Sequence, residues 1–199
     1  MWEEMTAVYV EEGLDKGAIW HFGEVSKEQR ALADGKAWAD LSHRAVIEIN
    51  GADRLTWLHS LTTQHLENLP SGEWKEALIL DPQGHIEQQL FLVDDGESTF
   101  IHLDHERLAP LLSYLEKMKF MLRVEVKDAS SDYAILRAPG VTDSLGGPYA
   151  LVPKGELAAT IAAFNSANLQ IGTWALEADR KSTRLNSSHV SESRMPSSA

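Results

Sequence analysis

Cysteine is absent from all 199 residues of the sequence. The chain therefore forms no disulfide bond and offers no thiolate as a nucleophile or as a ligand for a metal ion or cluster. It also lacks a glycine-rich phosphate-binding loop and the nucleophile elbow of serine hydrolases. The common catalytic motifs thus assign no catalytic residue to this chain.

Long apolar runs and an excess of basic residues are also missing. No apolar run approaches the roughly 20 residues that a transmembrane helix requires. The chain carries 30 acidic and 18 basic side chains, a formal net charge of −12, which disfavours nucleic-acid phosphates and anionic membranes. The acidic start, Met1-Trp2-Glu3-Glu4, does not resemble a signal peptide. We therefore expect a cytoplasmic protein with no nucleic-acid and no membrane partner.

Residues 179–199 differ in character from the rest of the chain. Residues 179–189 and 193–199 resemble two parts of a sequencing-library adapter, translated in one reading frame. A segment derived from an adapter carries no information about the fold of the protein. We therefore expect one domain over residues 1–178, incomplete at its C-terminal side, followed by a disordered tail at 179–199. The alternative is a natural polar tail, because a segment with few apolar residues also suits a disordered terminus.

The hydrophobic pattern predicts alternating strands and helices. Strands are expected at 44–50, 74–80, 85–93, 98–103, 123–127 and 133–137. Helices are expected at 26–39, from 51 onwards, at 105–117 and 156–164, and from 174 onwards. Pro82 and Gly84 occupy a turn that makes residues 74–93 a hairpin. The fold class is therefore α+β, with mixed or antiparallel sheets and flanking helices.

Four short motifs follow one another in a recognisable order. They are Ala39-Asp40-Leu41-Ser42, Ile49-Asn50-Gly51-Ala52-Asp53, Leu58-His59-Ser60-Leu61-Thr62-Thr63 and Leu80-Asp81-Pro82-Gln83-Gly84. This order resembles the N-terminal domain of the glycine-cleavage T-protein (aminomethyltransferase) superfamily. The continuation at 85–87 and the segment 172–178 look most like its YgfZ branch. The resemblance implies a folate-binding domain of the aminomethyltransferase type, with tetrahydrofolate as ligand and iron–sulfur enzymes as partners.

The sequence also departs from the family pattern. Aminomethyltransferases carry paired aspartates after the Pro-Gln-Gly turn, where this chain has Gln88 and Gln89. An amide cannot accept a proton as a general base. We therefore expect no methylamine transfer and assign no catalytic residues. The cysteine motif of the YgfZ branch, expected after residue 178, is absent.

The resemblance implies a folate site at five positions. They are Glu76, Asp81, Gln88, Trp174 and Glu177. A carboxylate suits the amide-like edge of a pterin ring, and an aromatic side chain can stack on it. Two structural alternatives stay open: Asp81 can cap its own turn, and Trp174 can belong to the core.

The histidines offer little evidence for a metal site. His102, Asp104 and His105 lie closest together in sequence, but a site needs three or four ligands that converge in space. The alternative is a strand that runs into a helix, with Asp104 as its N-cap. We expect no metal in residues 1–178.

Three functions follow from these observations. The first is a folate-binding protein that supports assembly or repair of iron–sulfur clusters, present here as an inactive fragment. The second is a folate-dependent aminomethyltransferase or demethylase, which Gln88 and Gln89 disfavour. The third is an interaction domain with no role in folate binding.

Overall fold

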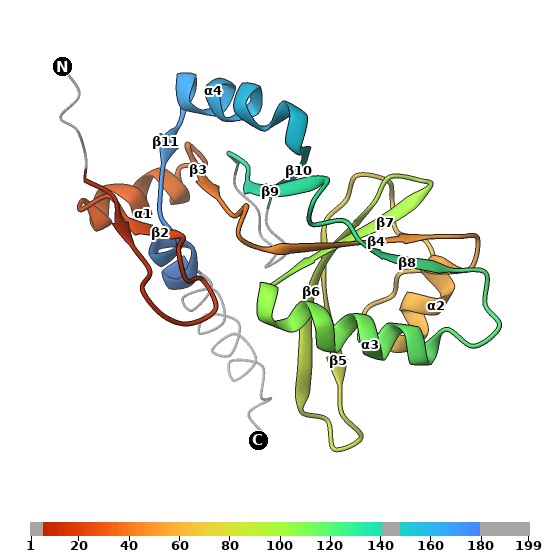
Figure 1. The fold of residues 1–199 in the computed structure, drawn as a ribbon. Helices are drawn as coiled ribbons and strands as arrows, with labels where there is room; N and C mark the ends of the chain where they lie inside the picture. Colours follow the sequence, from red (N-terminus) through yellow and green to blue (C-terminus); the bar gives the residue numbers. More distant parts are fainter. Residues whose placement is uncertain (1–5, 141–147, 180–199) are drawn as a thin grey trace, which may run out of the picture.

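The computed structural model describes residues 6–140 and 148–179. Three sheets are present in these residues (Figure 1). A five-stranded sheet has the order β5-β6-β7-β4-β8, a four-stranded sheet has the order β10-β9-β3-β11, and β1 pairs with β2. All pairs are antiparallel except β11 with β3. The predicted α+β class is confirmed.

The elements follow the chain in an intermixed order. The strands are β1 (Val8–Tyr9), β2 (Ile19–His21), β3 (Ala37–Asp40), β4 (Ala45–Asn50), β5 (Lys75–Leu80), β6 (Ile86–Asp94), β7 (Ser98–Leu103), β8 (Glu125–Asp128), β9 (Tyr133–Arg137), β10 (Tyr149–Pro153) and β11 (Leu169–Gln170). The helices are α1 (Val25–Ala33), α2 (Arg54–Leu61), α3 (Leu108–Met118) and α4 (Leu157–Ala167), with 3₁₀ turns η1 (His105–Arg107) and η2 (Lys154–Glu156). Residues 173–179 are also helical.

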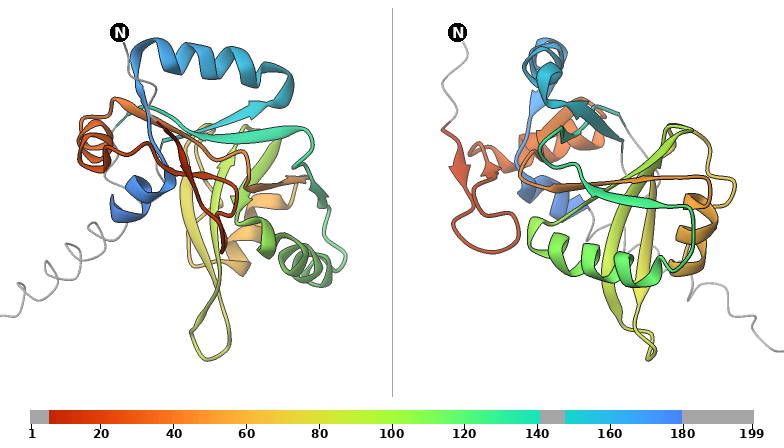
Figure 2. Two further views of the ribbon diagram at one scale, coloured as in Figure 1. Left: turned by 60° about the vertical axis from the view of Figure 1, so that its left-hand side comes forward. Right: turned by 45° about the vertical axis from the view of Figure 1, so that its right-hand side comes forward.

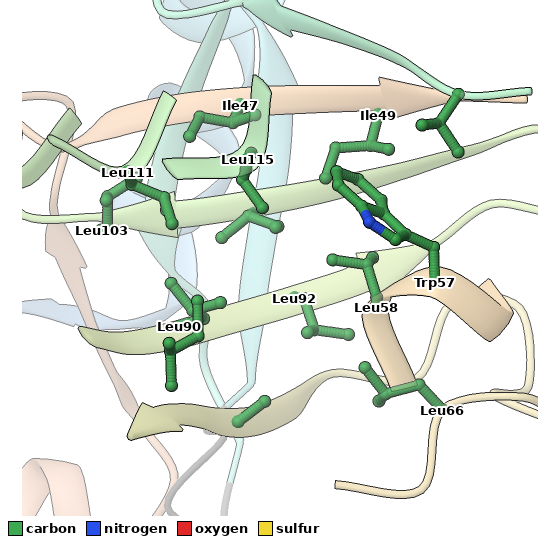
Figure 3. Packing of buried hydrophobic residues seen from close by; sticks show 14 of the residues in the cluster. Ile47, Ile49, Trp57, Leu58, Leu66, Leu90, Leu92, Leu103, Leu111 and Leu115 are labelled. Carbon is green, nitrogen blue, oxygen red and sulfur yellow. The ribbon is translucent and has the colours of Figure 1, made fainter. Parts of the chain in front are cut away.

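One face of the five-stranded sheet carries the largest hydrophobic core. Because side chains alternate along a strand, Leu90 and Leu92 of β6 face the same side as Ile47 and Ile49 of β4. Helices α2 and α3 cover this side of the sheet (Figures 1 and 2). Figure 3 shows Leu58 of α2 among these side chains. Burial of this apolar surface is the main stabilising contribution to the fold.

The opposite face of the same sheet packs against the four-stranded sheet. Val46, Val93 and Phe100 meet Ile135 of β9 in a second buried cluster. The outer side of the four-stranded sheet is covered by α4, where Trp38 Nε1 donates to Asn165 Oδ1 at 3.0 Å. The molecule therefore has four layers, which are α2 with α3, the five-stranded sheet, the four-stranded sheet and α4.

A buried carboxylate joins the N-terminal segment to residue 172. Glu28 of α1 is 1% exposed. Its two oxygens accept hydrogen bonds from Phe22 N at 2.7 Å and from Gly172 N at 2.9 Å. A Cβ atom at Gly172 would lie 2.0 Å from Trp20 O, so only glycine allows this approach.

The predicted helix at 26–39 was wrong in its second half. Helix α1 ends at Ala33, and Gly35 takes a φ of 68°. Residues Ala37–Asp40 form β3 instead, with Ala37, Trp38 and Ala39 all buried. A strand that is buried on both faces loses the alternation that distinguishes it from a helix. Strands β10 and β11 were likewise not expected from the sequence.

The turn after β6 is held by an ion pair. Asp94 is 2% exposed, and its carboxylate accepts from Arg54 Nε at 2.7 Å and from Arg54 Nη2 at 2.8 Å. Thr99 Oγ1 and Gly96 N also donate to it, at 2.5 Å and 2.9 Å. Burial alone would raise the pKa of Asp94, but the hydrogen bonds from Arg54, Thr99 and Gly96 outweigh burial and lower it.

Replacement of this carboxylate tests its contribution to stability. We expect Asp94→Asn to lower the free energy of unfolding by about 3 kcal/mol, because it leaves the Arg54 guanidinium without a charged partner. Urea denaturation measures the loss. Asp132→Asn, which removes the exposed Lys127–Asp132 pair, is the control and should cost much less. Equal losses in the two variants would contradict this account.

The lowered pKa also predicts a pH dependence. Asp94 contributes stability that is fully present above the unfolded-state pKa of about 3.9 and is lost as the pH falls through its lower folded-state value. The difference in stability between wild type and Asp94→Asn should therefore shrink below about pH 4. Urea denaturation at several pH values measures this difference in stability. A difference that stays constant down to about pH 2, roughly two units below the unfolded-state pKa, would argue against the role of the charge.

Candidate functional site

Two adjoining hollows lie at one end of the five-stranded sheet. The larger has a volume of about 630 Å³, and the smaller about 220 Å³. Both are lined by Leu14, Arg44 and Asp104. We call the two hollows together the Arg44 cleft. The larger volume lies within the range of about 300–1,000 Å³ that is usual for small-molecule sites.

Strand pairing brings the central charges of the cleft together. Arg44 immediately precedes β4, and Asp104 immediately follows β7. In the antiparallel pair Ala45 lies opposite Leu103, so the next residues outward, Arg44 and Asp104, lie opposite each other. Because Ala45 and Leu103 face the core, alternation directs Arg44 and Asp104 to the other face of the sheet.

Arg44 is shared between two carboxylates. Its Nη2 lies 3.8 Å from Asp15 Oδ1 and 3.6 Å from Asp104 Oδ1. Asp15 belongs to the loop between β1 and β2, and its Oδ1 also lies 2.8 Å from His43 Nε2. Arg44 Nε is buried and has no hydrogen-bond partner in the part of the chain that the structure describes. Its N–H group is therefore a donor that a ligand could satisfy.

The remaining lining of the larger hollow is strongly acidic. Glu11, Glu12 and Glu177 join the two aspartates there, whereas Arg44 is the basic residue among the described lining residues. Glu177 comes from the helix at 173–179, which also contributes Thr173 to the lining. This charge favours a ligand that presents several hydrogen-bond donors.

The smaller hollow borders a polar pair on the sheet. Gln89 lines it together with Phe91, and Gln89 Nε2 donates a hydrogen bond to Glu76 Oε1. Glu76 lies opposite Phe91 in the register of β5 and β6, so all three side chains share one face. The predicted residue Glu76 thus lies beside the cleft.

An aromatic cluster continues from Phe91 along the same face. His102 is fully buried, its ring stacks on Phe91 with centroids 5.0 Å apart, and Tyr149 crosses it at 4.5 Å. Trp74 lies 5.5 Å from His102. His102 is thus enclosed by rings, whereas His105 is exposed in η1. Among the described residues, His102, Asp104 and His105 do not form a cluster of ligand atoms.

Asp104 does not have the role that the capping alternative assigned to it. It occupies the N-cap position of η1, but its side chain makes no capping hydrogen bond. It faces Arg44 and Arg107 instead, at 3.6 Å and 3.9 Å. The expected side-chain cap was therefore wrong, because the two arginines compete for the carboxylate.

The other predicted site residues lie away from the lining of the cleft. Gln88 faces the side of the sheet opposite to Gln89, because adjacent residues of a strand alternate. Trp174 packs into the cluster around Leu32. Neither residue lines either hollow, so their contact with a ligand stays a prediction.

Asp81 holds the turn at the tip of the β5–β6 hairpin. Its Oδ1 accepts from Gln83 N at 2.9 Å and from His85 N at 2.8 Å. The side-chain hydrogen bond with His85, then the one from the His85 backbone, lowers the pKa of Asp81. The structural alternative of a turn cap is confirmed, and Asp81 does not line the cleft.

Sequence reasoning missed Arg44, Asp104 and Asp15 as a group. Arg44 begins one predicted strand, at 44–50, and Asp104 follows another, at 98–103, so their contact could have been inferred had the pairing of those strands been known. Nothing in the local sequence of Asp15 indicates its contact with His43, because the loop reaches the sheet only through tertiary packing.

The chain matches the family model described as the GCVT N-terminal domain over residues 2–142. This match covers more than half of the chain. The chain therefore belongs to the glycine-cleavage T-protein family, as its motifs predicted.

Curated relatives fall into two groups. A protein named iron–sulfur cluster assembly factor IBA57 homologue, mitochondrial, from Mycosarcoma maydis is 24% identical over 132 residues, which cover 59% of this chain and 33% of that protein. The aminomethyltransferase of Bacillus subtilis is 26% identical over 80 residues, which cover 40% of this chain and 22% of the relative. The chain thus spans a third or less of the length of these two relatives. The predicted YgfZ-like character is confirmed by the IBA57 group.

A solved structure has the same fold. The aminomethyltransferase T of the glycine cleavage system from Bartonella henselae superimposes with a TM-score of 0.69 at 15% identity, covering 87% of this chain and 58% of that one. At this identity the likeness shows the fold alone.

No helix among residues 6–140 and 148–179 is long and apolar enough to cross a membrane. Of the tail predicted at 179–199, Asp179 is the last residue of the helix at 173–179 and does not fit a disordered tail, and residues 180–199 lie outside the described residues.

Replacement of Arg44 tests whether this cation stabilises the two aspartates of the cleft. We expect Arg44→Gln to lower the free energy of unfolding by about 2 kcal/mol, because Asp15 and Asp104 then face each other without a shared cation. Arg107→Gln is the control, since the Arg107 side chain is 45% exposed and lies 3.9 Å from Asp104. Urea denaturation compares them, and an Arg44→Gln variant as stable as wild type would contradict the proposed charge network.

Proposed function

We propose that this chain, a member of the glycine-cleavage T-protein family, binds tetrahydrofolate in the Arg44 cleft. The observation that carries the proposal is the acidic hollow in which one arginine, with its side chain 11% exposed, lies between two carboxylates. A pterin ring presents N–H donors on one edge beside a carbonyl oxygen. Such an edge needs a carboxylate acceptor and an adjacent cationic donor, which Glu177 and Arg44 supply.

The neighbouring groups suit the rest of the ligand. Phe91 offers an aromatic surface at the smaller hollow, and Gln89 with Glu76 offers polar contacts. Arg107, which also lines the smaller hollow, is placed to pair with a carboxylate of a folate tail. The bound group would supply a one-carbon carrier, and the residues of this chain would orient it and shield one side from water.

The role that we infer for the complete protein is support of iron–sulfur enzymes rather than methylamine transfer. The similarity to proteins named as iron–sulfur cluster assembly factors supports the first role. Gln88 and Gln89 argue against the second, because an amide cannot take the proton that the transfer releases. In cells that lack the gene, activity of cluster-containing enzymes should fall and return with the intact gene. Unchanged activity would contradict this role.

Calorimetric titration of the full chain with tetrahydrofolate tests the binding site. We expect saturable binding of one molecule per chain, and Glu177→Gln should weaken it by about tenfold, which is the loss of one charged hydrogen bond of about 1.4 kcal/mol. Glu125→Gln is the matched control, because Glu125 is exposed on β8 and lines neither hollow.

Two results would overturn the proposal. The first is the absence of saturable binding to a folded wild-type chain, which would favour an interaction domain. The second is equal affinity of wild type and Glu177→Gln, which would place the ligand elsewhere. Release of methylenetetrahydrofolate from a methylamine donor would instead support the transferase alternative.

A further inference from the structure

Two histidines and a glutamate converge outside the Arg44 cleft. His59 lies on α2, and His65 and Glu67 lie in the segment between α2 and β5. Each residue offers one ligand atom, and these atoms all lie within 4.8 Å of one another. His59 is half-buried, and the other two side chains are exposed. None of the three lines either hollow of the cleft.

The backbone that carries these side chains is anchored on both sides. Leu66 is fully buried in the main core (Figure 3), which directs its neighbours His65 and Glu67 outward. Thr63 N donates to Leu78 O at 2.9 Å, and Leu78 N donates to Thr63 Oγ1 at 3.2 Å. The segment is therefore fixed to β5, and the three side chains do not depend on a mobile loop to meet.

The orientation of His59 is also fixed. Its Nδ1 lies 3.1 Å from Gln64 O. Because a carbonyl oxygen only accepts hydrogen bonds, Nδ1 is the protonated nitrogen of the neutral ring, which leaves the lone pair of Nε2 for a metal ion. In many metal sites a backbone carbonyl accepts a hydrogen bond from the imidazole nitrogen that does not bind the metal, and so fixes the orientation of the ring. The ring of His65 lies edge-on, with the centroids 4.8 Å apart, so both imidazoles border the same space.

We propose that His59, His65 and Glu67 bind a divalent transition-metal ion, with zinc as the favoured ion. Imidazole nitrogens and a carboxylate are ligands that zinc prefers, and three protein ligands leave a fourth position for water. Ligand atoms about 2.1 Å from one zinc ion lie roughly 3.4 Å apart in a tetrahedral site. Rotation of the exposed His65 and Glu67 side chains can close the remaining separation.

Titration of the untagged full chain with Zn²⁺ alone tests the proposal. We expect one high-affinity ion per chain, and His65→Ala and Glu67→Gln should each weaken its binding by about tenfold or more. His105→Ala is the matched control, because His105 is an exposed histidine outside the cluster. Both ligand variants change exposed side chains, and unfolding without metal verifies that they fold as wild type does.

Two independent readouts distinguish this site from adventitious binding. Zinc should raise the midpoint of thermal unfolding of wild type and His105→Ala but not of His65→Ala, because an ion that binds only the folded state stabilises it. Co²⁺ in place of zinc should give visible absorption bands of low-coordinate cobalt in wild type and His105→Ala but not in His65→Ala. No binding to wild type, or equal binding to His65→Ala, would overturn the proposal. Both results are independent of folate.

Discussion

The antiparallel pairing of β4 with β7 is the constraint on which the rest of the structure depends. It places Ile47 and Ile101 together in the main core, beneath α2 and α3. The same register carries Arg44 and Asp104 to one point at the end of the sheet. Stability and the candidate site therefore share one set of backbone hydrogen bonds, and a shift of β4 by one residue would turn Arg44 toward the apolar core.

The cleft also depends on contacts between parts that are distant in sequence. The loop between β1 and β2 contributes Asp15, and the helix at 173–179 contributes Glu177. Glu28 holds these two regions together, because its carboxylate binds Phe22 N and Gly172 N. A carboxylate that is 1% exposed is costly to bury unless it is hydrogen-bonded. Its two hydrogen bonds offset that cost and fix the wall of the larger hollow.

Most of the five-stranded sheet could be predicted from the sequence. The turn residues Pro82 and Gly84 indicate the hairpin of β5 and β6, although the second half of β6 and all of β7 are buried. In the four-stranded sheet β9 was predicted, at 133–137. Strand β3 was missed, since Ala37, Trp38 and Ala39 are all buried. Local alternation carries no information about a strand that is covered on both faces.

The candidate site was predictable only in part. Glu76 and Glu177 were found through the family resemblance, and the structure places both at or beside the cleft. Arg44 was missed because its partners come from β7 and from the N-terminal loop, and only tertiary structure joins them. Gln88 and Gln89 were considered as a pair, but adjacent strand residues face opposite sides.

A crystal structure of the chain with bound tetrahydrofolate tests the central claim most directly. The account predicts that the pterin ring lies in the Arg44 cleft, with its N–H edge within hydrogen-bond distance of Glu177 and its carbonyl oxygen facing Arg44. A pterin bound elsewhere on the chain, or one whose edge contacts neither residue, would contradict it.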